Sequence, residues 1–220
     1  LRAFYLKAHA KHFVDLQKFL AKAKKVYRVV ENPDLEKLSQ SKHHEGVCFI
    51  VNPPKSTSLS DWIDSEKKKT DSVLLVLENI GNPHNIGAII RIAAHFGVSA
   101  IASMDVKSLS SGAAIRTAEG GAEVIQNISI QDLKASMLSL KKNGYKVLTT
   151  SSHQGSSVYK HIFGGKTVLL FGEEGDGLSK EAFGLQDERI MIPGSGKVES
   201  LNVSTAIAII LSERYRQIKR

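Results

Sequence analysis

Three clusters of polar residues and glycines follow apolar segments in this 220-residue chain. The first runs from Asn79 to Gly87 and leads into Arg91, whose nearest neighbours in the sequence are Ile and Ala. A guanidinium at this place can grip a phosphate through two parallel hydrogen bonds. It can equally be a surface side chain or form a structural salt bridge. Asn85 is a candidate cap for the helix that this cluster introduces.

The second cluster, from Leu169 to Ser179, contains Gly172, Gly175 and Gly177. Glycines allow the backbone to bend sharply and to approach a ligand closely. The spacing, G-x-x-G-x-G, differs from the G-x-G-x-x-G fingerprint of dinucleotide-binding loops. The acidic side chains of the loop, among them Glu174, disfavour a phosphate ligand. They favour a ligand that carries positive charge or donates hydroxyl groups.

The third cluster runs from Ile192 to Ser204. Its Gly194–Lys197 segment is similar to the end of the phosphate-binding loop motif G-x-x-x-x-G-K-[ST] but does not match the whole motif. Met191 stands where the first glycine is required, and Val198 replaces the magnesium-binding Ser or Thr. Polar residues then alternate with apolar ones, at Ser200, Asn202 and Ser204. Helix capping accounts for one of these polar residues, so the others indicate a binding site.

The elements that carry these clusters predict an α/β domain from residue 72 onward. Val73–Leu77 is a continuous apolar run, as is typical of a buried parallel strand. Further strands are expected at 100–102, 123–125, 145–150, 166–171 and 189–192, and helices over about 85–96 and 198–218. The alternation implies a mostly parallel sheet with helices on both faces. Such sheets bind ligands at the carboxyl ends of their strands, where all three clusters fall.

Residues 1–52 predict a second, smaller α/β domain. Its expected helices cover 11–25 and 33–40, and its expected strands cover 26–30 and 46–51. Residues 53–71 hold two prolines, several Ser and Thr and three consecutive lysines, which favours a linker with at most a short helix near Trp62. The single cysteine, Cys48, lies in an apolar run and is expected to be a buried structural thiol, which favours a reducing compartment.

The net charge of +8 suggests a polyanionic partner. Residues 1–70 carry 14 Lys and Arg against 8 Asp and Glu, a net of +6, so the excess is concentrated in the first third. No apolar run approaches the roughly 20 residues that span a bilayer, and the scattered histidines predict no metal site. Arg116 and Glu119 either pair across one helical turn or face a ligand.

Taken together, the three clusters resemble the SpoU-type ribose 2′-O-methyltransferases of the SPOUT superfamily. The resemblance covers Val73 to about Arg216 and rests on Asn-x-Gly-x-x-x-Arg, Gly-x-Glu-Gly-x-Gly-Leu and Ser-Leu-Asn-Val-Ser elements. Glu173 and Gly194 are mild departures from the family pattern. Residues 1–52 resemble part of the L30e-like RNA-binding domain that precedes the catalytic domain in many members of the family.

This resemblance implies an S-adenosylmethionine-dependent RNA methyltransferase whose α/β domain, residues 72–220, ends in a trefoil knot. It implies a structured RNA substrate (tRNA or rRNA), a homodimer and a cytoplasmic location. The implied catalytic and substrate-orienting residues are Arg91, Asn85, Glu174, Ser200 and Asn202. The implied cofactor-binding residues are Gly172, Ile192 and Leu201, with Thr150 at a neighbouring strand end. Because an arginine side chain is not deprotonated in proteins, we expect Arg91 to hold a phosphate and stabilise alkoxide charge rather than act as the base.

Two other functions are compatible with the residues. One is a catalytically silent RNA-binding protein on the same fold, which calorimetry showing no S-adenosylmethionine binding would favour. The other is a nucleotide-binding oxidoreductase with a true Rossmann unit. The absent dinucleotide fingerprint counts against the second, and failure to bind a nicotinamide cofactor would exclude it.

Overall fold

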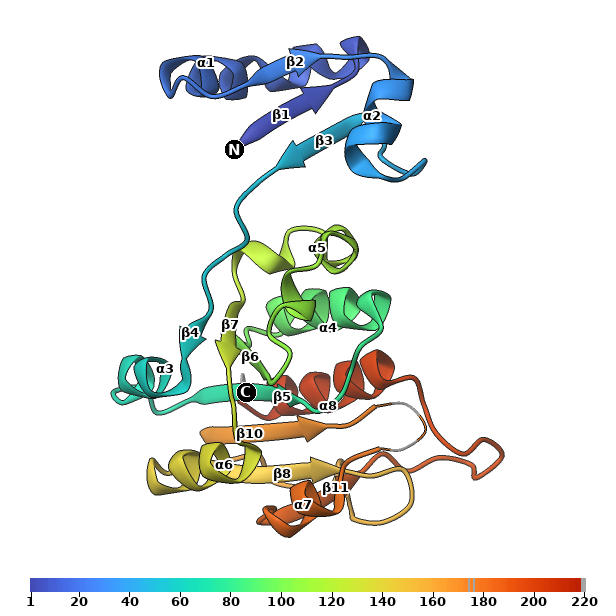
Figure 1. The fold of residues 1–220 in the computed structure, drawn as a ribbon. Helices are drawn as coiled ribbons and strands as arrows, with labels where there is room; N and C mark the ends of the chain where they lie inside the picture. The colour runs from blue at the N-terminus through green and yellow to red at the C-terminus, as the bar shows by residue number, and fades with distance from the viewer. Residues whose placement is uncertain (174, 176, 219–220) are drawn as a thin grey trace. The chain divides into compact units, whose positions relative to one another are not determined.

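The computed structural model describes residues 1–173, 175 and 177–218, and the chain divides into two compact units, Leu1–Pro53 and Pro54–Arg220. Figure 1 shows the course of the chain through both. The larger unit is built on an eight-stranded sheet of order β4-β7-β6-β5-β10-β8-β11-β9. Every pairing described in this sheet is parallel. The prediction of an α/β fold with a mostly parallel sheet is therefore confirmed.

The strands of the larger unit are short and their helices lie between them in the sequence. The strands are β4 (Thr57–Ser58), β5 (Ser72–Leu77), β6 (Ala100–Ser103), β7 (Gln126–Ser129), β8 (Lys146–Thr150), β9 (Ser156–Ser157), β10 (Lys166–Phe171) and β11 (Glu188–Met191). The helices are α3 (Leu59–Glu66), α4 (Pro83–His95), α5 (Gly112–Ala118), α6 (Leu133–Lys142), α7 (Lys180–Gly184) and α8 (Val203–Ile218). Two 3-10 turns, η2 (Ser108–Ser110) and η3 (Gly121–Glu123), flank α5.

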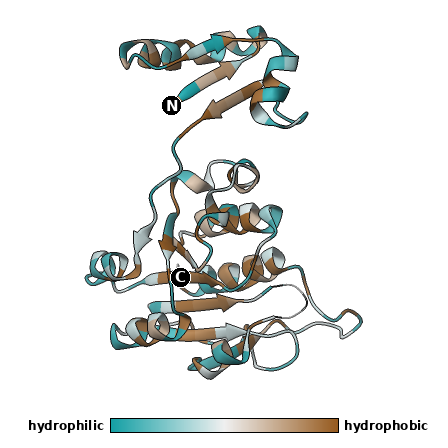
Figure 2. Cartoon of the chain, in the orientation of Figure 1, coloured by the Kyte–Doolittle hydropathy of each residue, from teal (hydrophilic) through white to brown (hydrophobic). Residues whose placement is uncertain are grey.

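Helices cover both faces of this sheet because each of its two central strands contains a continuous apolar run, Val73–Leu77 in β5 and Val168–Phe171 in β10. Side chains alternate between faces along a strand, so Val73, Leu75 and Leu77 of β5 pack into one core with α4, α5 and α8. Leu74 and Val76 pack into the opposite core with α3, α6 and α7. Figure 2 shows the resulting hydrophobic colour along β5 and β10. The continuous apolar run of the sequence thus corresponds to a strand buried on two sides.

The direction in which the sheet grows reverses at β5. Strands earlier than residue 130 lie on one side of β5, and strands later than residue 145 lie on the other. The first strand on the later side is β10, which pairs with β5 from Ser72–Lys166 to Leu77–Phe171. The loops after β5 and β10 consequently border the topological switch point, the usual ligand site of open parallel sheets.

Several predicted element boundaries differ from the structure, and three of the differences in the larger unit have a local reason. Helix α4 begins at Pro83 rather than near Asn85, because Asn82 accepts a 2.9 Å hydrogen bond from the His84 N–H and is the N-cap. Helix α8 begins at Val203 rather than 198, because the Asn202 side chain accepts hydrogen bonds from the backbone N–H groups of Ser204 and Thr205. The strand expected at 123–125 is misplaced: Glu123 ends η3, and β7 occupies Gln126–Ser129.

Within the segment from 53 to 71, β4 pairs with β7 at the sheet edge and α3 follows it. Trp62 and Ile63 of α3 are buried in the core shared with α6 and α7. Their burial was not predicted, because the segment is polar overall and the helix that carries them is otherwise rich in Ser, Asp and Glu. This stretch is therefore packed as part of the larger unit.

The smaller unit contains a three-stranded sheet of order β2-β1-β3. Its elements are β1 (Arg2–Tyr5), η1 (Lys7–Phe13), α1 (Val14–Lys22), β2 (Tyr27–Val29), α2 (Asn32–Ser39) and β3 (Val47–Ile50). Central strand β1, which pairs parallel with β2 and antiparallel with β3, was not predicted from the sequence. Cys48 in β3 is half-buried rather than buried, and its partial burial raises the pKa of the thiol.

A polar cluster joins the amino ends of β8, β9 and β11. The Glu188 carboxylate accepts hydrogen bonds from Lys146 Nζ at 2.5 Å and from Ser156 Oγ at 3.2 Å. Its Oε1 also lies 3.0 Å from Nδ1 of the buried His161. The hydrogen bond from Lys146, followed by that from His161, lowers the Glu188 pKa from 4.5 to about 2.

This depressed pKa makes stability depend on pH in a definite direction. The contribution of Glu188 is fully present above pH 4.5 and is lost as the pH falls towards 2. We expect Glu188→Gln to lower the melting temperature at pH 7 by about 2–4 °C, the shift produced by about 1 kcal/mol in a chain of this size. The variant should also lose less stability than wild type between pH 4.5 and 2, measured by circular dichroism.

The matched control is Glu181→Gln, which changes an exposed carboxylate in the first turn of α7. It should leave both the melting temperature and its pH dependence close to those of wild type. Equal behaviour of the two variants would contradict the role assigned to Glu188.

Candidate active site

The carboxyl ends of β5, β10, β8 and β11 lie side by side, and the predicted cofactor residues follow three of them. Thr150 ends β8 and donates a 3.1 Å hydrogen bond from Oγ1 to the Leu170 carbonyl in β10. Gly172 comes directly after β10, and Ile192 comes directly after β11, where it packs against the core. The fourth predicted cofactor residue, Leu201, precedes α8 and keeps 43% of its surface exposed.

The glycine-rich loop after β10 doubles back on itself. The Gly177 N–H donates to the Glu173 carbonyl at 3.0 Å, and a Cβ added at Gly172 would lie 2.1 Å from the Gly177 oxygen. Gly175 and Gly177 have φ values of +100° and +70°, which L side chains rarely adopt. The predicted catalytic residue Glu174 lies outside the described residues.

A buried carboxylate ties the far end of this loop to the end of β5. Glu78, which is 5% exposed, accepts hydrogen bonds from the Ser179 N–H at 2.8 Å and the Ser179 Oγ at 2.7 Å. Ser179 in turn caps α7 by accepting from the Ala182 N–H at 3.1 Å. We did not assign a role to Glu78 from the sequence. The sequence offered one signal for it: Glu78 is a charged residue directly after the apolar run at 73–77.

The first and third clusters meet through two asparagines that are 117 positions apart. Asn202 Nδ2 donates to Asn85 Oδ1 at 3.0 Å. The Asn202 Oδ1 atom accepts from the Ser204 N–H at 2.9 Å and from the Ser204 hydroxyl at 2.6 Å. The predicted residue Ser200 lies in the exposed segment that leads into this cap. The structure therefore brings Asn85 and Asn202 together, with Ser200 two residues away.

The chain must cross the strand ends to make this contact. Strand β11 pairs with β8, on the far side of β10 from β5, whereas α8 packs against α4, which follows β5. The segment between Met191 and Asn202 consequently passes over the carboxyl edge on which the glycine-rich loop also lies. Figure 1 shows it as the long orange-red loop that extends beyond the strands.

Arg91 lies on α4, two turns after its start, and its guanidinium contacts a residue of another element. Its Nη1 atom is 2.9 Å from Oε1 of Glu119, which follows α5. Gly87, one turn before Arg91, lies directly against α5: a Cβ there would be 2.4 Å from Thr117 Cβ and 2.5 Å from the Ala114 oxygen. The glycine of the Asn-x-Gly-x-x-x-Arg element thus serves helix packing, and the ion pair with Glu119 was not predicted.

None of the described helices is long and apolar enough to cross a membrane. Among residues 1–173, 175 and 177–218, no group of three or more His, Cys, Asp or Glu is placed to hold a metal ion.

Two family models match the chain. Residues 72–212 match the SpoU rRNA Methylase family, and residues 1–57 match the family described as RNA 2′-O ribose methyltransferase substrate binding. The matches cover both compact units and leave only the last few residues and a short stretch in the middle unmatched.

Curated relatives carry names of the same kind. The chain is 40% identical over 219 residues to an uncharacterized tRNA/rRNA methyltransferase of Escherichia coli O157:H7, a match that covers 100% of this chain and 63% of that protein. It is 32% identical over 184 residues to a 23S rRNA (guanosine-2′-O-)-methyltransferase of Vibrio vulnificus, covering 83% of this chain and 74% of that protein. The chain therefore spans less than two thirds of the length of its Escherichia coli relative.

A solved structure with the same fold is that of an rRNA methyltransferase from Sinorhizobium meliloti with bound AdoMet. It aligns with a TM-score of 0.79 over 99% of this chain and 80% of that chain, at 20% identity. A likeness at this level of identity concerns the fold.

The close approach at Gly172 gives a direct test of the glycine-rich loop. A methyl group added at Gly172 would collide with backbone atoms of Gly177 and Leu178. Backbone atoms cannot move aside as the end of a flexible side chain can. We expect Gly172→Ala to lose about 1–3 kcal/mol of unfolding free energy, the usual penalty of overpacking, and its melting temperature to fall by roughly 2–12 °C.

Gly184→Ala is the matched control, because a Cβ at Gly184 meets nothing within 4 Å. Thermal denaturation of both variants should separate them clearly. If both kept the melting temperature of wild type, the loop would not be closed on itself as described.

Proposed function

This chain belongs to the SpoU rRNA methylase family, and from that premise we propose that it transfers a methyl group from S-adenosylmethionine to a ribose 2′-hydroxyl of tRNA or rRNA. The main support is the Asn202–Asn85 hydrogen bond, which joins the first and third polar clusters beside the glycine-rich loop. The family match sets aside the alternative of a nucleotide-binding oxidoreductase.

The residues at the carboxyl edge suit S-adenosylmethionine, which supplies an electrophilic methyl group on a positively charged sulfur. We propose that backbone groups near Gly172, Ile192 and Leu201 hold it, with Thr150 at the neighbouring strand end. The exposed Leu201 side chain offers an apolar surface for an adenine ring. The backbone at Gly172 is held by the doubled-back loop, and an acidic loop suits a cationic ligand.

The proposed roles around the ribose follow from what each side chain can donate or accept. A guanidinium donates hydrogen bonds and does not act as a base in proteins, so Arg91 holds a phosphate beside the target ribose and stabilises charge developing on the 2′-oxygen. Asn85, Ser200 and Asn202, together with Glu174, orient the hydroxyl or the methionine part of the donor. Holding the hydroxyl in line with the methyl group lowers the barrier by several kcal/mol.

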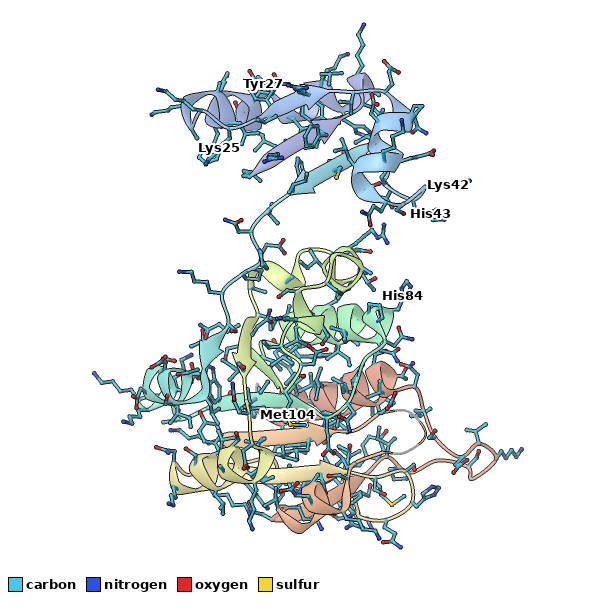
Figure 3. All side chains as sticks on the ribbon, viewed as in Figure 1. Lys25, Tyr27, Lys42, His43, His84 and Met104 are labelled. Carbon is cyan, nitrogen blue, oxygen red and sulfur yellow. The ribbon has the colours of Figure 1, made fainter. Side chains whose placement is uncertain are left out.

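We propose that residues 1–52 bind the RNA and that residues 72–220 form the catalytic domain. Residues 53–71 connect these two parts of the chain. The match of residues 1–57 to a substrate-binding family supports this division. Around edge strand β2 the smaller unit exposes several cations and an aromatic ring, of which Figure 3 labels Lys25 and Tyr27. The exposed residues are Lys22, Lys24, Lys25, Tyr27 and Arg28. Cations bind phosphates, and aromatic rings stack on unpaired bases.

The trefoil knot and the homodimer that the resemblance implies also belong to this proposal. The passage of the segment 192–202 across the strand ends, where the glycine-rich loop lies, supports the knot. The partly exposed apolar residues of α8, among them Tyr215 at 44%, support a dimer, which analytical ultracentrifugation would detect. A tRNA or rRNA substrate would place the protein in the cytoplasm.

Replacing Arg91 tests the reaction. With tritiated S-adenosylmethionine and unmodified rRNA and tRNA transcripts, we expect Arg91→Ala to lower kcat by about 100- to 1,000-fold, as loss of one charge-stabilising donor does. Binding of S-adenosylmethionine, measured by calorimetry, should stay unchanged, because Arg91 acts on the RNA. A rate within a few-fold of wild type would remove Arg91 from the mechanism.

Lys142→Ala provides the matched control. It removes an exposed cation at the end of α6, near the amino end of β8 rather than at the carboxyl edge. Its kcat should equal that of wild type. Absence of S-adenosylmethionine binding by the wild-type chain would instead favour a catalytically silent RNA-binding protein.

A further inference from the structure

The turn after α5 is fitted to Arg91 through its acidic side chain. Helix α5 ends at Ala118, and Glu119 takes the left-handed conformation with φ +44°. Its N–H donates to the Arg116 carbonyl at 3.3 Å. This change of direction takes the Glu119 side chain off the helix and brings Oε1 to 2.9 Å from Arg91 Nη1. This conformation is uncommon for a residue other than glycine because it is sterically strained. The turn therefore presents the Glu119 carboxylate at a cost in backbone conformational energy.

The same turn also touches the backbone that carries Arg91. A Cβ at Gly121 would lie 3.1 Å from the Arg91 Cα atom and 3.1 Å from the Ile90 oxygen, so glycine allows η3 to lie directly on α4. One helical turn before Arg91, Gly87 allows α5 to lie directly against α4. These two close contacts hold the turn and the helix at a set separation, and the carboxylate of Glu119 is therefore presented from a defined place.

The chemistry of the guanidinium explains what such a contact does. A guanidinium has five N–H donors in one plane, and Glu119 occupies only Nη1 among the groups described. The remaining donors stay available to a phosphate. The side chains of Arg91 and Glu119 are 58% and 62% exposed, so the pair adds little to folding stability. Such a contact can still favour one orientation of the Arg91 side chain.

We propose that Glu119 is a positioning residue for Arg91, and that the turn from Glu119 to Gly121 aims the guanidinium at the RNA. This inference rests on the function proposed above. Glu119 touches neither substrate in this scheme and acts only through Arg91. Its loss lets Arg91 sample orientations that do not reach the phosphate, which lowers the productive fraction of bound complexes.

The kinetic test separates positioning from a surface ion pair. With tritiated S-adenosylmethionine and unmodified rRNA and tRNA transcripts, we expect Glu119→Ala to lower kcat about five-fold, which is about 1 kcal/mol in transition-state free energy. The KM for RNA should stay near that of wild type, because the change affects the reacting geometry more than binding. Glu119→Gln retains an acceptor oxygen and should fall between wild type and Glu119→Ala.

A double-mutant cycle shows whether Glu119 acts through Arg91. In an Arg91→Ala background, adding Glu119→Ala should cause no further loss of kcat, because its target is already absent. Glu123→Ala, which removes an exposed carboxylate from the same 3-10 turn, should leave kcat unchanged. Additive losses in the cycle, or a fall in KM with unchanged kcat, would overturn the proposal.

A spectroscopic readout keeps this inference separate from the proposed function. In ¹⁵N spectra of the guanidinium groups, the contact with Glu119 should slow rotation about the Nε–Cζ bond and resolve the two Nη signals of Arg91. Glu119→Ala should average them, and Arg91→Lys assigns the signals. Identical spectra of wild type and Glu119→Ala would overturn the positioning role. Absence of methyl transfer by the wild-type chain would overturn the proposed function, and the catalytic part of this inference with it.

Discussion

The pairing of β5 with β10 constrains the rest of the larger unit. Six residue pairs join two strands that are almost entirely buried, so both faces of the sheet must be covered, and every side chain in 73–77 and 168–171 is apolar. Polar groups can follow these strands but cannot interrupt them. Because the strand order also reverses here, the loops after β5 and β10 are brought together at one edge with the ends of β8 and β11. The three polar clusters of the sequence converge for this reason.

Prediction from the sequence succeeded where a single physical signal dominated. The segment predicted as a strand at 166–171, whose last four residues are apolar, gave β10 with its observed limits, and the apolar run at 73–77 gave all but the first residue of β5. The start of α8 was misplaced because Ser200 to Asn202 also fit a helical pattern, and only the hydrogen bonds of Asn202 reveal the cap. The Arg91–Glu119 pair joins α4 to the turn after α5, and no spacing along the sequence indicates an ion pair between these two elements. The roles of the site residues stay predictions.

Three glycines, two of them in the motifs, matter here mainly because they let segments of the backbone approach one another closely. Gly87 lets α5 lie against α4, Gly121 lets η3 lie against the backbone at Arg91, and Gly172 lets the loop after β10 fold onto Gly177. At each position a single added carbon would lie within 3.1 Å of other atoms, main-chain atoms among them. Since protein interiors are packed as densely as organic crystals, these contacts set the separations between the elements that carry polar side chains. The motif spacing therefore encodes packing distances as well as chemistry.

The hydrogen bond between Asn85 and Asn202 has a consequence for the making of the protein on the ribosome. Its two ends are 117 residues apart, and at about 5–20 residues per second the second asparagine is synthesised roughly 6 to 23 s after the first. Throughout this interval the smaller unit is already translated, whereas the cap of α8 does not yet exist. A nascent or prematurely terminated chain that stops before Asn202 therefore cannot assemble the edge at which the clusters meet, so the synthesis of Asn202 sets the earliest time at which that edge can be complete.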